Sequence, residues 1–122
     1  MVRKYDLEDR LVYFSSRVIQ LVESLPATKS ACYLANQIVR CGVAPSLLYG
    51  EAQGAESRDD FVHKMKVALK ELKETRISLK LISKNGMAAN IESLCRENDE
   101  LIAIFAKSIE TAKTNKHLKQ QV

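Results

Sequence analysis

The chain has 122 residues, of which 46% are apolar and 28% are charged, and its formal net charge is +4. This size and composition indicate one globular domain that covers residues 1–122. No apolar run approaches the roughly 20 residues that span a bilayer. The charged first residues also lack an apolar secretory core, so we expect a cytoplasmic protein without membrane contact.

A first helix is predicted over residues 7–25, with Asp6 as its cap. Its apolar residues follow one another at steps of four and three, which places them on one face of an α-helix. They are Leu7, Leu11, Phe14, Val18, Leu21 and Leu25. Pro26 ends this helix, because a residue that precedes proline avoids the helical region. The next loop is short, which favours an antiparallel second helix.

Thr28 caps the second helix, which is predicted over residues 29–53. Its main stripe consists mostly of small residues: Ala31, Ala35, Ile38, Gly42, Pro45, Tyr49 and Ala52. Pro45 removes a backbone hydrogen bond to the Cys41 carbonyl, so we expect a kink at residues 41–45. A break into two helices between Gly42 and Pro45 is the alternative.

Larger apolar residues of the second helix lie off this stripe: Leu34, Val39, Val43, Leu47 and Leu48. A helix that is apolar on every side is buried on every side. One bundle does not easily cover such a helix, so we expect a subunit interface to cover part of it.

A third helix, residues 58–84, organises the chain. Ser57 precedes it as a cap, with Asp60 three residues on, and Asn85-Gly86 follows where a left-handed residue would end the helix. Its seam, again at steps of four and three, consists of Phe61, Met65, Ala68, Leu72, Thr75, Leu79 and Ile82. Leu72 lies midway along this seam, so we expect it to be almost fully buried.

The fourth helix is predicted over residues 89–113, and its apolar face is formed by Ile91, Leu94, Leu101, Ile102, Phe105, Ile109 and Ala112. The tail, residues 114–122, is polar and basic, and we expect it to fray. Four helices with short loops predict an all-α, antiparallel up-down-up-down four-helix bundle with a kinked second helix.

The sequence offers little that indicates catalysis. Glu51, Glu71 and Glu74 suggest a carboxylate site, but no Glu-x-x-His motif of a di-iron bundle is present. The cysteines, Cys32, Cys41 and Cys95, are odd in number and lack CxxC spacing, which disfavours zinc and disulfides. We therefore expect no metal, no cofactor and no catalytic residue. Glu51 and Glu71 are better interpreted as partly buried acids that pair with Arg40 or Arg76.

The outer face of the third helix is basic. Lys66, Lys73 and Lys80 are seven residues apart, with Lys70 and Lys84 beside them. Residues 57–84 hold eight Lys and Arg against four Asp and Glu. A row of ammonium groups can follow a phosphate backbone of RNA or DNA without reading its sequence. A merely solvated helix face is the alternative. No aromatic residue interrupts the row, so base stacking is not expected.

A set of residues in the middle of the chain forms a recognisable pattern: Gln37, Arg40, Ser46, Glu51, Ser57, Phe61, Glu71 and Glu74. This pattern resembles the bacterial four helix bundle protein family, which was named after members encoded in intervening sequences of 23S ribosomal RNA genes. Tyr49 and Ala52 depart from the family, which usually has a polar residue and glycine there, and Pro45 is a further oddity. These departures concern local helix geometry.

The resemblance implies an antiparallel bundle that assembles as a homopentamer and has no known catalytic residue. The matching residues are then structural or assembly residues. A related accessory protein of diversity-generating retroelements looks similar, and it binds nucleic acid and a reverse transcriptase. Our leading hypothesis is therefore a non-enzymatic oligomer that presents basic surface to RNA or DNA. A protein–protein adaptor is the alternative, and an enzyme that uses the Glu51/Glu71 pair is a weaker one.

Overall fold

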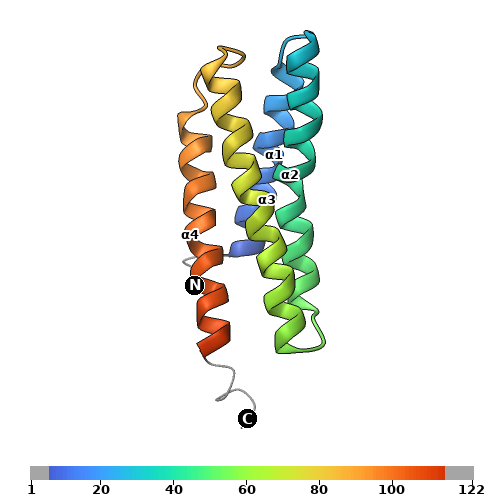
Figure 1. Ribbon diagram of the computed structural model, residues 1–122, viewed down its shortest axis with the longest axis vertical. Helices are drawn as coiled ribbons and strands as arrows, with labels where there is room; N and C mark the ends of the chain where they lie inside the picture. The colour runs from blue at the N-terminus through green and yellow to red at the C-terminus, as the bar shows by residue number, and fades with distance from the viewer. Residues whose placement is uncertain (1–5, 115–122) are drawn as a thin grey trace.

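The computed structural model describes residues 6–114, which form four α-helices (Figure 1). Their bounds are Leu7–Ser24 for α1, Lys29–Gln53 for α2, Arg58–Lys84 for α3 and Glu92–Thr114 for α4. The second and third helices coincide with the predicted ranges, whereas the first ends one residue early. The predicted fraying of the tail concerns residues that, apart from Thr114 at the end of α4, lie outside the described part.

Side-chain caps fix the starts of the first three helices. Asp6, Thr28 and Ser57 each have an extended backbone and accept a hydrogen bond from the amide three residues on. The distances are 3.3 Å to Asp9 N, 3.2 Å to Ala31 N and 3.0 Å to Asp60 N. Each bond satisfies an amide that the first turn leaves without a helical partner. The predicted caps are confirmed.

A glycine turn ends α3. Gly86 has a φ of +63°, in the left-handed region that glycine adopts without steric cost. The amide of Met87 donates to the Ile82 carbonyl at 3.0 Å, and the amide of Gly86 donates to the Ser83 carbonyl at 3.1 Å. These two bonds form a Schellman motif, which satisfies the last carbonyls of the helix. The predicted end of the third helix is therefore confirmed.

The start of α4 differs from the prediction. It begins at Glu92 and not at residue 89. Asn90 has a φ of +58°, which no α-helical residue can have. The first bond of the helix instead runs from the Cys95 amide to the Ile91 carbonyl, at 3.0 Å. The left-handed Asn90 thus delays the helix, and apolar spacing alone gives no sign of it.

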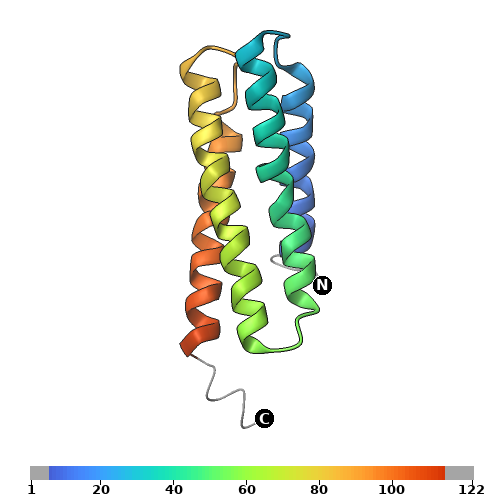
Figure 2. The ribbon, with the colours of Figure 1, turned by 45° about the vertical axis from the view of Figure 1, so that its right-hand side comes forward.

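Each helix packs against the next one along the chain, and α1 also packs against α4, which closes the bundle. The three connections lie at alternate ends of the molecule, as Figure 1 and Figure 2 both show. Consecutive helices therefore run in opposite directions. In the described residues no helix is long and apolar enough to cross a membrane.

The core consists of one stripe from each helix. Leu72, at the middle of α3, is 0% exposed, as predicted. All of the predicted third-helix seam is buried except Phe61, which is partly buried. The largest buried side chains are Phe14 of α1 and Phe105 of α4. The spacing of apolar residues therefore identifies the buried face of each helix correctly.

The first two helices approach each other closely at Gly42. A Cβ added there would lie 2.8 Å from Val18 Cγ1, a distance that real Cβ atoms essentially never show. Ser15 Oγ also donates to the Gly42 carbonyl at 3.3 Å. α2 continues as one helix through Pro45, so the alternative of two separate helices is wrong. The predicted kink at residues 41–45 stays a prediction.

The off-stripe residues of α2 are better covered than expected. Leu34 is buried, and Val39, Val43 and Leu48 are partly buried within the single chain. Of these five residues only Leu47 is exposed, at 64%. The bundle itself therefore covers most of the surface that we assigned to a subunit interface. Any such interface has to be sought on the outer faces of the helices.

Candidate functional site

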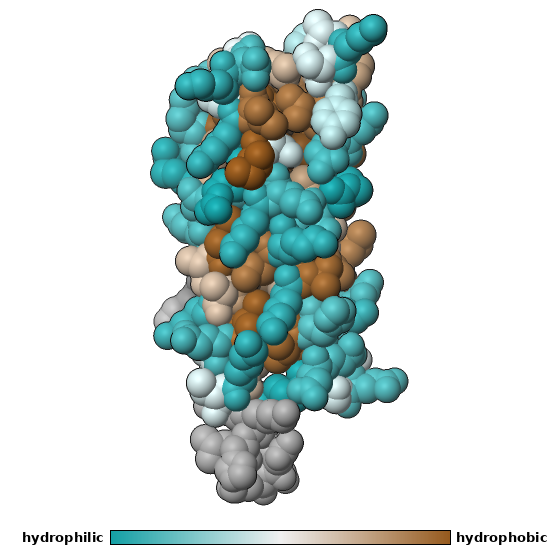
Figure 3. Space-filling model, in the orientation of Figure 1, coloured by the Kyte–Doolittle hydropathy of each residue, from teal (hydrophilic) through white to brown (hydrophobic). Residues whose placement is uncertain are grey.

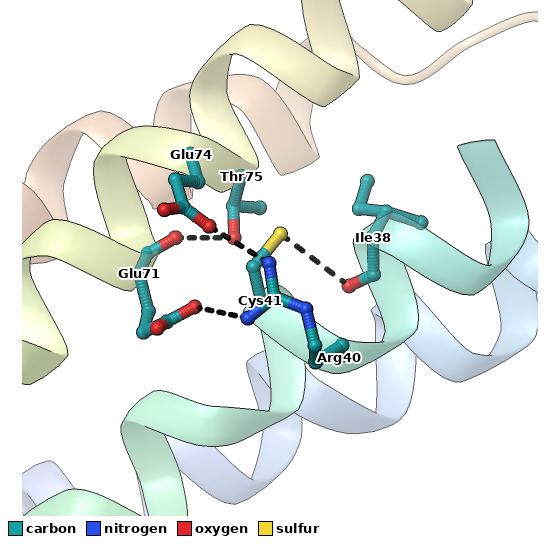
Figure 4. A network of polar contacts seen from close by, with 6 residues as sticks. All are labelled: Ile38, Arg40, Cys41, Glu71, Glu74 and Thr75. Atoms are coloured by element: carbon teal, nitrogen blue, oxygen red, sulfur yellow. Dashed lines mark hydrogen bonds and ion pairs between the residues drawn. The ribbon is translucent and has the colours of Figure 1, made fainter. Parts of the chain in front are cut away.

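Arg40 of α2 joins two carboxylates of α3 across the helix interface (Figure 4). Its Nη1 lies 3.1 Å from Glu71 Oε1, and its Nη2 lies 2.9 Å from Glu74 Oε1. The hydrogen bond to Glu74 and the charge of Glu71 raise the pKa of Arg40. The Glu71 side chain is only 12% exposed, whereas that of Arg40 is 53% exposed. The prediction of a buried acid that pairs with Arg40 is thus confirmed for Glu71.

Buried hydroxyl and thiol groups lie directly behind this ion pair. Thr75 Oγ1 donates to the Glu71 carbonyl at 2.9 Å, and Cys41 Sγ contacts the Ile38 carbonyl at 3.9 Å. Burial raises the pKa of the Cys41 thiol, and it also raises that of Cys95. A thiol with a raised pKa carries little thiolate, which is the nucleophilic form. These two cysteines are therefore poorly suited to nucleophilic catalysis.

Glu51 does not join Glu71, and its predicted partner is wrong. Its carboxylate is 55% exposed and lies 2.9 Å from Lys64 Nζ, not near Arg40 or Arg76. Each of the two acids thus has its own cation from the neighbouring helix. Within residues 6–114, no group of three or more His, Cys, Asp or Glu side chains is placed to hold a metal ion.

The other residues of the recognised pattern serve local structure. Ser57 caps α3, and Phe61 lines a hollow with Tyr49. Ser46 Oγ donates to the Val43 carbonyl at 2.9 Å and accepts from Ser15 of α1 at 3.2 Å. Gln37 is partly buried, about one turn before Arg40. The pattern therefore describes contacts between helices rather than one reactive centre.

The lysine face is the name we use for Lys66, Lys70, Lys73, Lys80 and Lys84 of α3. All five are exposed, and none forms an ion pair with a carboxylate of residues 6–114. From Lys66 to Lys84 the face is about 27 Å long, at a rise of about 1.5 Å per residue. The structure thus confirms that these lysines lie together on the outer side of α3.

A shallow hollow of about 470 Å³ lies along the lysine face. Its lining residues are Lys66, Leu69, Lys70, Lys73, Glu74 and Ile77. The hollow therefore combines an apolar floor with a cationic rim. Its one acid, Glu74, is already engaged by Arg40. An anion placed here would meet ammonium groups whose charge is not cancelled by a neighbouring acid.

Sequence reasoning missed two contacts between α3 and α4. Arg58 Nη1 donates to the Ala112 carbonyl at 2.8 Å. Lys113, at the end of α4, lies beside Lys66 and lowers the pKa of that lysine. A cation from another helix therefore lies next to one end of the lysine face. No periodicity within one helix indicates a contact of this kind.

Two further polar residues were missed. Arg10 of α1 binds Glu97 and Glu100 of α4 at 2.6 Å each, and the hydrogen bond to Glu97 raises the pKa of Arg10.

Asn98 is 0% exposed, and its Nδ2 donates to the Leu72 carbonyl at 3.1 Å. Its Oδ1 has no hydrogen-bond partner among the described residues. The steps of four and three from Leu94 through residue 98 to Leu101 already place Asn98 on the buried face.

Comparison with known proteins places this architecture in a family. The family model of the 23S rRNA-intervening sequence proteins matches residues 4–107. The chain belongs to the 23S rRNA-intervening sequence protein family. The matched residues include the Arg40 cluster and the whole lysine face, whereas Lys113 lies beyond them. Among curated proteins none matches the chain.

A crystal structure of one relative supports the fold of this 23S rRNA-intervening sequence protein. It is a protein of unknown function from the S23 ribosomal protein family of Bacteroides thetaiotaomicron VPI-5482. The two chains are 27% identical, with a TM-score of 0.80, and the alignment covers 85% of this chain and 98% of the other. The two proteins thus share the four-helix architecture along nearly the whole of the relative, whose function is unknown.

Proposed function

We propose that this 23S rRNA-intervening sequence protein is a non-enzymatic, cytoplasmic helical bundle that self-assembles and binds RNA or DNA through its lysine face. One observation carries the proposal. All five lysines are exposed without a described carboxylate partner, while Arg40, Lys64 and Arg10 each engage an acid. The bundle thus uses some cations to hold its helices together and leaves one row available for a polyanion.

The row suits a phosphate backbone in length and chemistry. Ammonium groups bind phosphates as point charges and do not read base edges. A face of about 27 Å reaches several phosphates on one strand. The apolar floor at Leu69 and Ile77 can lie against sugar carbons, and it offers no aromatic ring for stacking. Binding should therefore be strong at low salt and indifferent to sequence.

Self-assembly is the second part of the proposal. Large apolar side chains are exposed on the outer faces of α2 and α3, namely Tyr33, Leu47, Ile77 and Leu81. Figure 3 shows apolar side chains at the surface among charged ones. Contact between copies would cover some of them, and the family resemblance implies a homopentamer. Repeating the lysine face around a ring would add weak contacts through multivalency.

The same exposed side chains support the alternative, a protein–protein adaptor, because apolar surface rimmed by charge is typical of interfaces. An enzyme that uses Glu51 and Glu71 has less support. Each carboxylate is held by a cation from the facing helix, and the Cys41 and Cys95 thiols have raised pKa values. Neither feature produces the activated group that acid–base or nucleophilic catalysis requires.

The test of nucleic-acid binding compares two triple variants of equal charge. The first is Lys66→Glu/Lys73→Glu/Lys80→Glu, on the lysine face. The control is Lys29→Glu/Arg96→Glu/Lys107→Glu, whose residues are exposed elsewhere on the bundle. Fluorescence anisotropy with labelled RNA and DNA of unrelated sequences gives the affinity at several salt concentrations.

We expect the first variant to lose binding and the control to lose much less, because the contacts are local to the lysine face. The variant Lys66→Gln/Lys73→Gln/Lys80→Gln, which replaces three charges by neutral side chains, should reduce the slope of log affinity against log salt by about 2–3, since each phosphate contact contributes about 0.7–0.9. A wild-type protein without affinity for any RNA or DNA at low salt would end the proposal and leave the adaptor.

Assembly is tested separately by sedimentation equilibrium of the wild-type protein. We expect an oligomer at micromolar concentration, and Leu81→Glu should shift it toward smaller species. A wild-type monomer under these conditions would contradict the self-assembly part without affecting the binding result.

A further inference from the structure

A second hollow lies between the first turns of α3 and the end of α4. It has a volume of about 370 Å³, and its lining residues are Arg58, Asp59, Val62, His63, Lys66 and Lys113. Five of these six side chains are polar or charged, and they come from the start of α3 and the end of α4, which are far apart in the sequence. The hollow adjoins the lysine face, because Lys66 belongs to both.

The bond between Arg58 and the Ala112 carbonyl builds this hollow. It occupies a carbonyl in the last turn of α4, where the helix itself provides no donor, and it holds that turn against α3. Lys113 is the next residue, so its ammonium group is placed beside that of Lys66. Contact with Lys113 lowers the pKa of Lys66, as expected for two cations that repel each other.

The charges of the lining residues leave an excess of two positive charges. Arg58, Lys66 and Lys113 are cationic, whereas Asp59, which has an interaction partner of its own, is the one acid of the lining. His63 also lines the hollow and offers a ring N–H donor. A phosphomonoester carries about −1.5 to −2 charges at pH 7 and three acceptor oxygens. A phosphodiester carries one negative charge and matches this excess less well.

We propose that this hollow binds a phosphomonoester, as found at the end of a nucleic-acid strand whose backbone lies along the lysine face. The proposal rests on the proposed function, since Lys66 serves both surfaces. An anion between Lys66 and Lys113 removes their mutual repulsion, and the Arg58 guanidinium keeps further N–H donors beside the one that it gives to Ala112. The strand end would then set where the bound backbone begins.

The experiment compares an oligonucleotide that ends in a phosphate with the same oligonucleotide that ends in a hydroxyl, with the phosphate placed at either end in turn. The test variant is Lys113→Gln, which lies outside the lysine face. The matched control is Lys84→Gln, at the other end of the face. Inorganic phosphate is titrated separately into each protein and followed by NMR of the backbone amides.

We expect wild-type protein to prefer a phosphorylated end about tenfold, the discrimination typical of one charge-assisted hydrogen bond. Lys113→Gln should lose this preference and keep its affinity for the hydroxyl-ended strand, whereas Lys84→Gln should weaken both strands equally. Inorganic phosphate should shift the amides of residues 58–66 in wild-type protein but not in Lys113→Gln.

Two results would overturn the inference. If wild-type protein binds both strands with equal affinity, the result is compatible with nucleic-acid binding by the lysine face but contradicts the phosphomonoester site. If neither strand binds, the proposed function fails. The titration with inorganic phosphate then tests by itself whether the hollow binds phosphate. Millimolar phosphate that leaves the amides of residues 58–66 unchanged would show that the hollow holds no phosphate.

Discussion

Truncation of Leu72 tests the packing on which every other argument depends. This side chain is 0% exposed at the middle of α3, whereas Leu81 on the same helix is 44% exposed. Leu72→Ala removes three carbons, which lose about 2.4 kcal/mol of transfer free energy at about 0.8 kcal/mol per carbon. The remaining cavity adds about 1–2 kcal/mol where neighbours cannot collapse into it. We therefore expect a loss of about 3–4 kcal/mol in the free energy of unfolding.

Urea denaturation followed by circular dichroism measures this loss, and Leu81→Ala is the matched control. It removes the same atoms from the same helix on the outer face, so a change within about 0.5 kcal/mol is expected at low protein concentration. A concentration-dependent loss in Leu81→Ala would instead indicate that assembly buries Leu81. Equal and small losses in both variants would refute the assignment of the α3 seam.

Three other substitutions test individual contacts by the same measurement. Gly42→Ala should lower the free energy of unfolding by up to about 2 kcal/mol, because overpacking against Val18 outweighs a gain of about 1 kcal/mol in helix propensity; a stabilised variant would contradict the close approach of α1 and α2. Arg40→Ala should lower the free energy of unfolding, because it leaves the largely buried Glu71 carboxylate without its cation. Adding Glu71→Gln should recover part of that loss. A lack of recovery would show that the Arg40–Glu71 ion pair does not contribute to the free energy of unfolding. Asn98→Leu should raise the free energy of unfolding by about 1 kcal/mol, because the penalty of about 1–3 kcal/mol for a buried amide oxygen without a described partner exceeds the loss of the bond to the Leu72 carbonyl; a destabilised variant would show that the hydrogen bonds of Asn98 contribute more than the unpaired oxygen costs.

The sequence by itself determines the helices and their buried faces. Steps of four and three along α1 and α3 place Leu11, Phe14, Leu72 and Leu79 in the core, because helical periodicity is a local property of the chain. Caps are local too, since Ser57 reaches an amide only three residues away. The exposure of the lysine face follows in the same way, from its position opposite the seam.

The tertiary structure decides which groups meet across the helix interfaces. Arg40 takes both Glu71 and Glu74, while Glu51 goes to Lys64, and the pairing depends on the relative height of α2 and α3. Periodicity reports the side of a helix that a residue occupies but not its partner on the next helix. The meeting of Lys66 with Lys113, which creates the proposed phosphomonoester hollow, likewise depends on where α4 ends against α3, and only packing fixes that position.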